Sequence, residues 1–302
     1  MIEITVFTPT YNRAYIIKNV YDSLLKQNYN NFEWLVIDDG SSDNTEELIS
    51  SFMKENKIDI VYIKKENGGQ HTALNLAIEK ARGRLIMIVD SDDYLTDNAL
   101  KRVAYWESTI HGKDDFAGVA GLKVNEAGEV IGDKWTIDNR FVDATNFQRK
   151  KCNLRGDKAE AYYTSVLKKY GPIPIFEGEN DVEKAVLWNR IANDELKIRW
   201  FDEGIYICEY LKDGMSMNIE KNHLKNFQGF TCWKKELIDM QKSYIRVVAE
   251  TSAYIGIAQK KGLSNREMAK ALSRSVITII CAKIYAQLHI LKGKMCEHNE
   301  NK

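Results

Sequence analysis

Residues 4–89 alternate apolar, strand-like runs with helical patterns, and this alternation limits the fold more than any other feature of the chain. The runs are ITVFT (4–8), FEWLVI (32–37), IDIVYI (58–63) and RLIMIV (84–89). Amphipathic helical spacing lies between them, as in residues 45–53. Four strands joined through helices over so short a stretch predict right-handed βαβ crossovers and a buried parallel sheet.

The pattern is looser after residue 110. Three later stretches are interpreted as a strand, a helix and a pair of strands: FAGVAGLKV (116–124), AVLWNRIA (185–192) and IRWFDEGIYICEY (198–210). From about residue 226 onward the period is helical. We therefore expect one α/β domain over residues 1–225 and a helical extension over residues 226–302.

Charge and cysteine content exclude several classes of protein. Lys plus Arg and Asp plus Glu both total 43, which argues against a nucleic-acid binder that relies on a bulk positive field. Five scattered cysteines without a CxxC pair predict neither a disulfide framework nor a zinc site, so we expect a reducing, cytoplasmic location. The start MIEITVFTPTYNR lacks the features of a signal peptide, and no uninterrupted apolar stretch is long enough to predict a membrane span.

An acidic stretch, DSDD, follows the fourth apolar run and is the strongest chemical signal in the chain. Asp90, Asp92 and Asp93 lie within four residues, and their carboxylates repel one another unless a positive group lies among them. Hard oxygen ligands of this kind suit Mg²⁺ or Mn²⁺, which keeps several waters and bridges diphosphate oxygens. The alternative is a helix cap in a solvated turn.

Three further loops follow strand ends and lead to the same edge of the predicted sheet. They are TPTYNR (8–13), DDGS (38–41) and NGGQH (67–71). Asp39 is placed to present a carboxylate to a nucleoside, and Pro9 with Tyr11 to form a wall against a base, although plain turns explain each loop singly. For Ser42 and Asp43 a helix-cap role is favoured. Ligands bind beyond the carboxyl ends of parallel strands, so the four loops together predict one cleft.

These four stretches, in this order and spacing, resemble the nucleotide-binding half of the family 2 glycosyltransferases over residues 3–100, and less closely to about residue 215. The resemblance implies a GT-A fold, with a Rossmann-like, mostly parallel sheet between helices. It divides the α/β domain into a nucleotide-binding half, residues 1–110, and an acceptor half, residues 111–225.

The activity that the resemblance implies is an inverting transfer from a nucleotide diphosphate sugar, most often a UDP sugar, assisted by Mn²⁺ or Mg²⁺. The acceptor is a hydroxyl of a glycan or lipid-linked molecule in bacterial polysaccharide biosynthesis.

Site residues are carried over from the family by position. Pro9, Tyr11 and Asp39 are expected to hold the nucleoside, with Asn67 and Gln70 approaching it. Asp90 is expected to contact ribose or sugar and, with Asp92, the metal. A late loop in CEYLKDGMSMN (208–218) places Ser216, and with it Lys212, against the diphosphate. Many relatives have a basic residue near the Gly-Gly turn, where this chain has Gln70.

The catalytic base in the family is an acid just before a helix that carries a tryptophan, here Trp188. The position that matches is Lys184, and the candidate bases are Glu183 and Asp181 on its N-terminal side. Charge at a helix N-terminus is the alternative explanation for these acids and for Glu179.

Two other functions stay open at this point. One is a degenerate relative that binds a nucleotide sugar without transfer, because a charged Lys184 cannot accept a proton. The other is a haloacid-dehalogenase-like phosphatase, in which Asp90 attacks phosphate and Asp92 is the acid. A dehydrogenase is not supported, since no GxGxxG follows a strand.

Two stretches concern partners. Tyr162, Tyr163 and Tyr170 are candidates for an acceptor wall, with core packing as the default for at least one of them. The segment SVITIICAKIYAQLHILKGK (275–294) is apolar over much of its surface. We favour a packed helix that closes the domain; contact with the cytoplasmic face of a membrane, or a homodimer, is the alternative.

Overall fold

The computed structural model describes residues 2–133, 135–136, 139–208 and 219–300, with side chains as far as residue 289. The chain divides into two compact units. Unit 1 comprises residues 1–173 and 187–214, and unit 2 comprises residues 174–186 and 215–302. Each has its own hydrophobic core. The division into domains at residue 225 stays a prediction.

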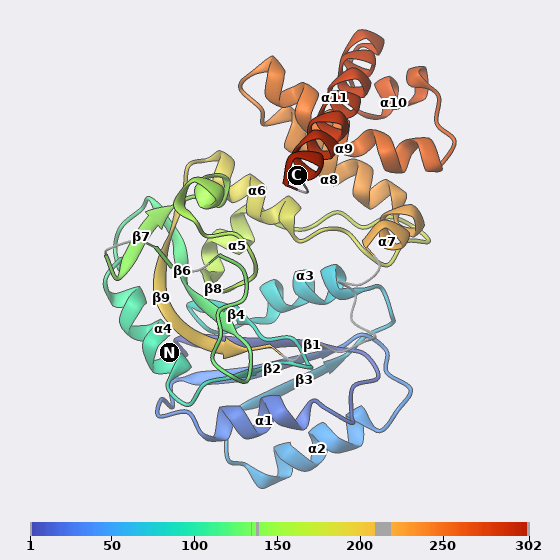
Figure 1. Ribbon diagram of the computed structural model, residues 1–302. Coiled ribbons are helices and arrows are strands. Elements are labelled where there is room, and N and C mark those ends of the chain that lie inside the picture. The colour runs from blue at the N-terminus through green and yellow to red at the C-terminus, as the bar shows by residue number, and fades with distance from the viewer. Residues whose placement is uncertain (1, 134, 137–138, 209–218, 301–302) are drawn as a thin grey trace. The chain divides into compact units, whose positions relative to one another are not determined.

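Unit 1 is built on one mixed sheet, which in the described residues has nine strands in the order β3-β2-β1-β4-β8-β6-β9-β5, with β7 paired to β9 (Figure 1). The strands are β1 (Ile4–Thr10), β2 (Phe32–Asp38), β3 (Ile60–Lys64), β4 (Leu85–Ile88), β5 (Tyr94–Leu95), β6 (Phe116–Val124), β7 (Phe141–Ala144), β8 (Lys158–Tyr163) and β9 (Lys197–Ile207).

The four strands predicted at the start of the chain are confirmed as β1 to β4, and their pairings are all parallel. Beyond β4 the sheet is mixed, because β8 runs antiparallel to both β4 and β6. The predicted pair of strands at 198–210 is wrong. The described part of this stretch belongs to the single strand β9, which pairs with β6 through register shifts. Irregular pairing absorbs the polar residues at 202–204, so the chain bulges instead of turning back.

The helices of unit 1 cover both faces of the sheet. They are α1 (Lys18–Leu25), α2 (Thr45–Glu55), α3 (Gln70–Lys80), α4 (Ala99–Ser108), α5 (Thr164–Tyr170), and α6 (Ala185–Asn193), which begins in unit 2, with a short 3-10 helix η1 (Asn146–Cys152). Apolar side chains of α1, α2 and α4 form one core with the sheet. Figure 1 shows α3 on the opposite face from α1 and α2. Burial on both faces explains why the early strands are continuous apolar runs.

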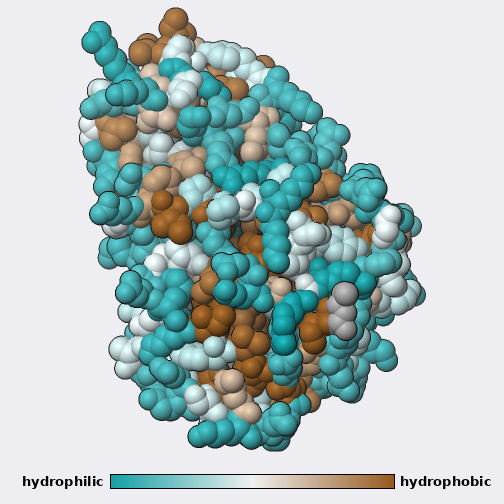
Figure 2. Space-filling view, turned by 180° about the vertical axis from the view of Figure 1, so that it is seen from behind, coloured by the Kyte–Doolittle hydropathy of each residue, from teal (hydrophilic) through white to brown (hydrophobic). Residues whose placement is uncertain are grey.

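Residues 219–300 of unit 2 are mainly helical, which confirms the predicted helical end of the chain. Its helices are α7 (Ile219–Lys225), α8 (Phe227–Asp239), α9 (Tyr244–Lys260), α10 (Asn265–Ala271) and α11 (Val276–Glu300). Its core includes Phe230, Tyr254 and Ile279. Among the described residues no single helix is long and apolar enough to cross a membrane; α10 and residues 276–289 pass that test only as a pair bent by 107°. Figure 2 shows hydrophobic patches within a largely hydrophilic face.

Candidate functional site

The carboxyl ends of β1, β2 and β3 lie side by side at one edge of the sheet. Thr10 is paired with Asp38, and Asp38 with Lys64. β4 runs parallel to β1 and ends in the same direction, immediately before the acidic stretch. The four loops selected from the sequence therefore leave the sheet at the same edge, as predicted.

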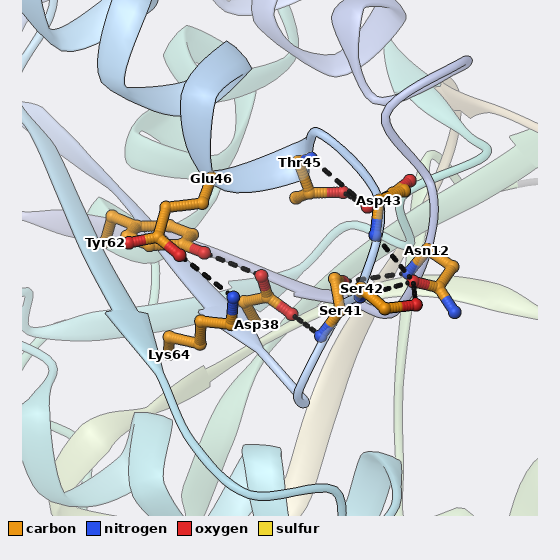
Figure 3. A network of polar contacts seen from close by, with 9 residues as sticks. All are labelled: Asn12, Asp38, Ser41, Ser42, Asp43, Thr45, Glu46, Tyr62 and Lys64. Atoms are coloured by element: carbon orange, nitrogen blue, oxygen red, sulfur yellow. Dashed lines mark hydrogen bonds and ion pairs between the residues drawn. The ribbon is translucent and has the colours of Figure 1, made fainter.

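The loops after β1 and β2 are joined to each other by side-chain hydrogen bonds (Figure 3). The Asn12 amide donates to Ser41 Oγ at 2.8 Å, and the Ser42 amide donates to Asn12 Oδ1 at 2.8 Å. Asn12 has a φ of 53°, a left-handed conformation that asparagine tolerates. Asp43 Oδ2 accepts from the Ala14 amide at 3.0 Å. These bonds thus hold the two loops against each other.

Asp43 also has the structural role that the sequence favoured. Its Oδ1 accepts from the amide and hydroxyl of Thr45, the first residue of α2, at 3.1 and 2.6 Å. Burial acts to raise the pKa of Asp43, but the hydrogen bonds from Thr45 and Ala14 lower it below the usual value.

Asp38 and Asp39 are neighbours with different partners. Asp38 is fully buried and accepts from the Tyr62 hydroxyl at 2.6 Å and the Ser41 amide at 2.7 Å (Figure 3). Burial, and then the bond to Asp38, raise the pKa of Tyr62, which keeps the phenol a donor. Asp38 therefore fixes the end of β2 from inside the fold.

Asp39 organises the loop before α3. Its two carboxylate oxygens accept from the amides of Gly68 and Gly69 at 3.0 and 2.7 Å, and Lys65 Nζ lies 2.5 Å from Oδ1. Gly40 has a φ of +85°, and a Cβ there would lie 3.0 Å from the Asn67 amide nitrogen. Hence Asp39 supports the loop that carries Asn67 and Gln70, while its contact with a nucleoside stays a prediction.

The other predicted nucleoside contacts differ in exposure. Pro9 is buried in β1, whereas Tyr11, just beyond it, is 50% exposed and available to a ligand. Asn67 is exposed, and its Nδ2 donates to the Asp39 carbonyl at 2.8 Å. Gln70, at the start of α3, donates from Nε2 to Asp90 Oδ1 at 2.9 Å. The structure thus brings Gln70 and Asp90 together, and His71, next to Gln70, is buried.

A buried lysine lies among the acidic side chains. Lys123 Nζ, on β6, is 3.9 Å from an oxygen of Asp90 and 3.9 Å from an oxygen of Asp93. It also lies 4.0 Å from the centre of the Tyr206 ring, whose hydroxyl donates to Asp93 at 2.7 Å. Burial acts against its charge, but Asp90, Cys208 and Asp93 together raise the pKa of Lys123. This is the positive group that the clustered carboxylates require.

Sequence reasoning missed Lys123 and Tyr206. The available signal was a lysine near the end of the otherwise apolar run 116–124. Such a residue is costly in a buried strand unless it meets an acid, so it pointed to a buried ion pair.

Asp92 is the carboxylate of this stretch that is suited to an external cation. Burial, followed by repulsion from Asp90, raises the pKa of its carboxyl group. A divalent cation would relieve that repulsion, so Asp92 and Asp90 fit a metal. No group of three or more His, Cys, Asp or Glu able to hold a metal occurs in the described residues. Mg²⁺ in nucleotide sites usually takes one or two carboxylates and completes its shell with phosphate oxygens and water.

The candidate bases belong to unit 2. Glu183 Oε1 lies 2.9 Å from His223 Nε2, and Asp181 accepts from the Asn222 side-chain amide. Glu179 accepts from the amides of residues 228 and 229 at 2.7 and 2.8 Å, so it caps α8. Glu179 therefore lies at a helix N-terminus, as the alternative explanation expected. The helix is α8, however, and not α6, which carries Trp188. Ser216 and Lys212 lie outside the described residues.

Comparison with known proteins assigns the fold. It is of the GT-A type, as in the solved glycosyltransferases described below. The model of the family described as "Glycosyl transferase family 2" matches residues 5–151 of the chain. The match includes the DSDD stretch at residues 90–93. It therefore favours the glycosyltransferase interpretation of these acids over the phosphatase alternative.

Curated relatives are similar to about a third of the chain. "Glycosyltransferase GlyG" of Streptococcus pneumoniae is 36% identical over 99 residues, 32% of this chain and 33% of that protein. "Poly(ribitol-phosphate) beta-N-acetylglucosaminyltransferase TarS" of Staphylococcus aureus is 32% identical over 37% of this chain and 20% of that protein. "Putative teichuronic acid biosynthesis glycosyltransferase TuaG" of Bacillus subtilis is 34% identical over 33% and 39%. The matched regions thus span well under half of these relatives.

Solved structures extend the likeness in fold. S. aureus TarS 1–349 in complex with UDP-GlcNAc has a TM-score of 0.62 at 18% identity, covering 94% of this chain and 92% of that one. Mannosyltransferase PcManGT from Pyrobaculum calidifontis, in complex with GDP-Man and Mn²⁺, has a TM-score of 0.56 at 16% identity, covering 94% and 87%. At these identities the likeness establishes the GT-A fold.

Proposed function

We propose that this chain is an inverting glycosyltransferase that moves a sugar from a nucleotide diphosphate sugar, in the first place a UDP sugar, to an acceptor hydroxyl. The acceptor is a glycan or a lipid-linked molecule of cell-surface polysaccharide synthesis. The observation that carries the proposal is the cluster of Asp90, Asp92 and Asp93 around Lys123 at the end of β4, within a family 2 domain. Names of relatives, and the UDP-GlcNAc complex of a similar fold, support the donor class.

The residues of unit 1 bind and orient the donor. Tyr11 is exposed beside the loops that Asn12 and Asp39 hold in place, so it packs against the nucleobase of the donor. Asp92 and Asp90 would hold a Mn²⁺ or Mg²⁺ ion, which would supply positive charge to neutralise the diphosphate. Gln70 keeps Asp90 oriented.

Transfer requires a proton acceptor opposite the leaving group. The acceptor hydroxyl gives its proton to a carboxylate, its oxygen forms the bond to C1 of the sugar, and the C1–O bond to the diphosphate breaks. The nucleoside diphosphate leaves with the electron pair. Glu183 and Asp181 are the proposed bases.

The test is a calorimetric titration of the full chain with UDP, GDP and dTDP, each with and without Mn²⁺. We expect one nucleotide to bind in a Mn²⁺-dependent manner, and Asp92→Ala to lose that dependence. Asp22→Ala, which removes an exposed partner of Lys18 on α1, is the control and should keep it. Unchanged Mn²⁺-dependent affinity in Asp92→Ala would remove Asp92 from the metal site. Turnover of the bound donor with Mn²⁺ separates a transferase from a protein that only binds.

We also propose a cytoplasmic location, with the end of unit 2 against the membrane. Along α11 four exposed aliphatic side chains follow one another at helical spacing: Ile277, Ile280, Ile284 and Leu288. A lipid-linked acceptor would be reached most directly by an enzyme held at that surface.

A further inference from the structure

β8 presents a carboxylate on the face of the sheet that carries the acidic site. Ala159, Ala161 and Tyr163 belong to the core beneath the sheet, so Glu160 and Tyr162 alternate to the other face. On β4 the residues Leu85 and Met87 belong to the same core.

The register of these strands places Glu160 close to the acidic stretch. Met87 is paired with Ala161 in the antiparallel β4–β8 ladder. One residue further along each strand lie Ile88 and Glu160, and Asp90 follows two residues later. Glu160 therefore lies just before the acidic stretch, on a strand that adjoins β4.

Cations flank Glu160. Lys123, which bridges Asp90 and Asp93, also acts electrostatically on Glu160, and Arg149 lies 3.9 Å from its Oε1. Burial raises the pKa of Glu160, while Arg149 and Lys123 oppose that rise. The side chain is mostly buried but stays 22% exposed, so a ligand can reach part of it.

An aromatic pair lies next to this carboxylate. Tyr162, two residues along β8 on the same face, stacks on Trp188 with ring centres 4.3 Å apart and planes 1° from parallel. The Tyr162 hydroxyl accepts from Asn146 Nδ2 at 2.9 Å, which fixes the ring. Tyr162 is buried, whereas Trp188 is partly exposed. The predicted acceptor wall is thus, for Tyr162, a packed support for Trp188.

We propose that Glu160 is a specificity residue that binds hydroxyls of the donor sugar and restricts the donor to neutral sugars, an inference that rests on the proposed function. The sugar is attached to the diphosphate, which the neighbouring Asp90 and Asp92 site holds. A carboxylate has two acceptor oxygens and no donor, so it matches a pair of adjacent sugar hydroxyls. Trp188 offers an apolar surface beside it.

The same carboxylate selects against acidic sugars. A uronic acid would bring a second carboxylate toward Glu160 in a partly buried site, where like charges repel strongly. Specificity of this kind depends as much on the repelled ligand as on the bound one.

The experiment compares the affinities of UDP, UDP-glucose and UDP-glucuronate for the full chain with Mn²⁺. Glu160→Gln keeps the shape of the side chain and removes its charge. We expect unchanged UDP affinity, UDP-glucose affinity lower on the order of tenfold, and a smaller preference for UDP-glucose over UDP-glucuronate. The matched control is Glu79→Gln, at an exposed side chain near the end of α3, which should change none of the three affinities.

The outcomes separate this inference from the proposed function. Suppose that UDP binds, and that the unmodified chain and Glu160→Gln show the same preference for UDP-glucose over UDP-glucuronate. The sugar-binding role of Glu160 is then wrong, while the proposed function stands. If the unmodified chain binds no UDP, the donor assignment is wrong and this role falls with it. A changed acceptor KM with unchanged donor affinities would also overturn the inference, since Glu160 would then serve the acceptor.

Discussion

Glu183 and Asp181 differ in the partners that hold their carboxylates, and this difference can be tested. We expect one of the two variants Glu183→Gln and Asp181→Asn to lower kcat by about 10²- to 10⁴-fold, the usual contribution of a general base. The nucleotide Kd should change little, because a base acts on the acceptor proton.

The control for this comparison is Glu177→Gln, an exposed acid of the same segment. It should keep full activity with a donor that the titrations have identified. If both Glu183→Gln and Asp181→Asn also stay fully active, the base is not in this segment, and the match of Lys184 to the family's acidic position has no catalytic meaning.

The sequence alone predicts which residues form the acidic site, but it does not predict which side chains contact them. DSDD at a strand end was enough to locate the acidic site, since carboxylates in that pattern require a positive group. Which group meets them depends on β6 and β9, which are distant in sequence, so Lys123 and Tyr206 could not be assigned in advance. Asp39 likewise matched its family position, whereas its bonds to Gly68 and Gly69 depend on the folded loop.

At the scale of elements, the position of β8 depends on Gly118 in β6. A Cβ added there would lie 2.1 Å from the Ala161 carbonyl oxygen, far inside contact distance. We therefore expect Gly118→Ala to lower the free energy of unfolding by about 1–3 kcal/mol, as overpacking does. It should also weaken sugar binding, because the strand that it displaces carries Glu160.

Gly256, within α9, is the contrasting case, since a Cβ there meets nothing within 4 Å. Gly256→Ala should raise stability by about 0.5–1 kcal/mol through helix propensity. Thermal unfolding measures both changes: the midpoint temperature should fall for Gly118→Ala and rise for Gly256→Ala. Equal stability of Gly118→Ala and the unmodified chain would mean that β6 and β8 are further apart than described.

Helices and strands can be predicted from the sequence where the pattern of apolar residues within the segment itself determines them. The first four strands and the helices between them were read correctly because each apolar run lies between turns. β9 was read as two strands because residues 202–204 look like a turn, and only its pairing with β6 shows them as an irregularity. Pairing partners come from the whole sheet, so no local pattern contains them.

At the scale of the whole molecule, the family match ends at residue 151 and leaves the helical unit 2 without an assigned role. Exposed apolar side chains of this unit include those at the beginning of α9 and those along residues 276–288 of α11. Tyr244 and Ile245 are 57% and 73% exposed, and the Tyr244 hydroxyl lies 3.4 Å from Thr278 Oγ1. Residues 276–289 contain one charged residue, Lys283, and Lys242 and Arg246 are exposed beside Tyr244. Aliphatic side chains flanked by basic ones, without exposed acids among them, are complementary to an anionic lipid surface.

Co-sedimentation of the full chain with lipid vesicles tests this role. We expect binding to vesicles that contain anionic lipid and weaker binding to neutral ones. The double variant Ile277→Ser with Ile284→Ser should reduce binding on the order of tenfold, since it removes two exposed apolar contacts. Leu25→Ser with Met53→Ser, exposed on α1 and α2, is the matched control and should bind normally. Absence of vesicle binding together with a dimeric mass in solution, reduced to a monomer by the α11 variant, would instead assign this surface to a second copy of the chain. Absence of both would leave α11 as a helix that only closes its own unit.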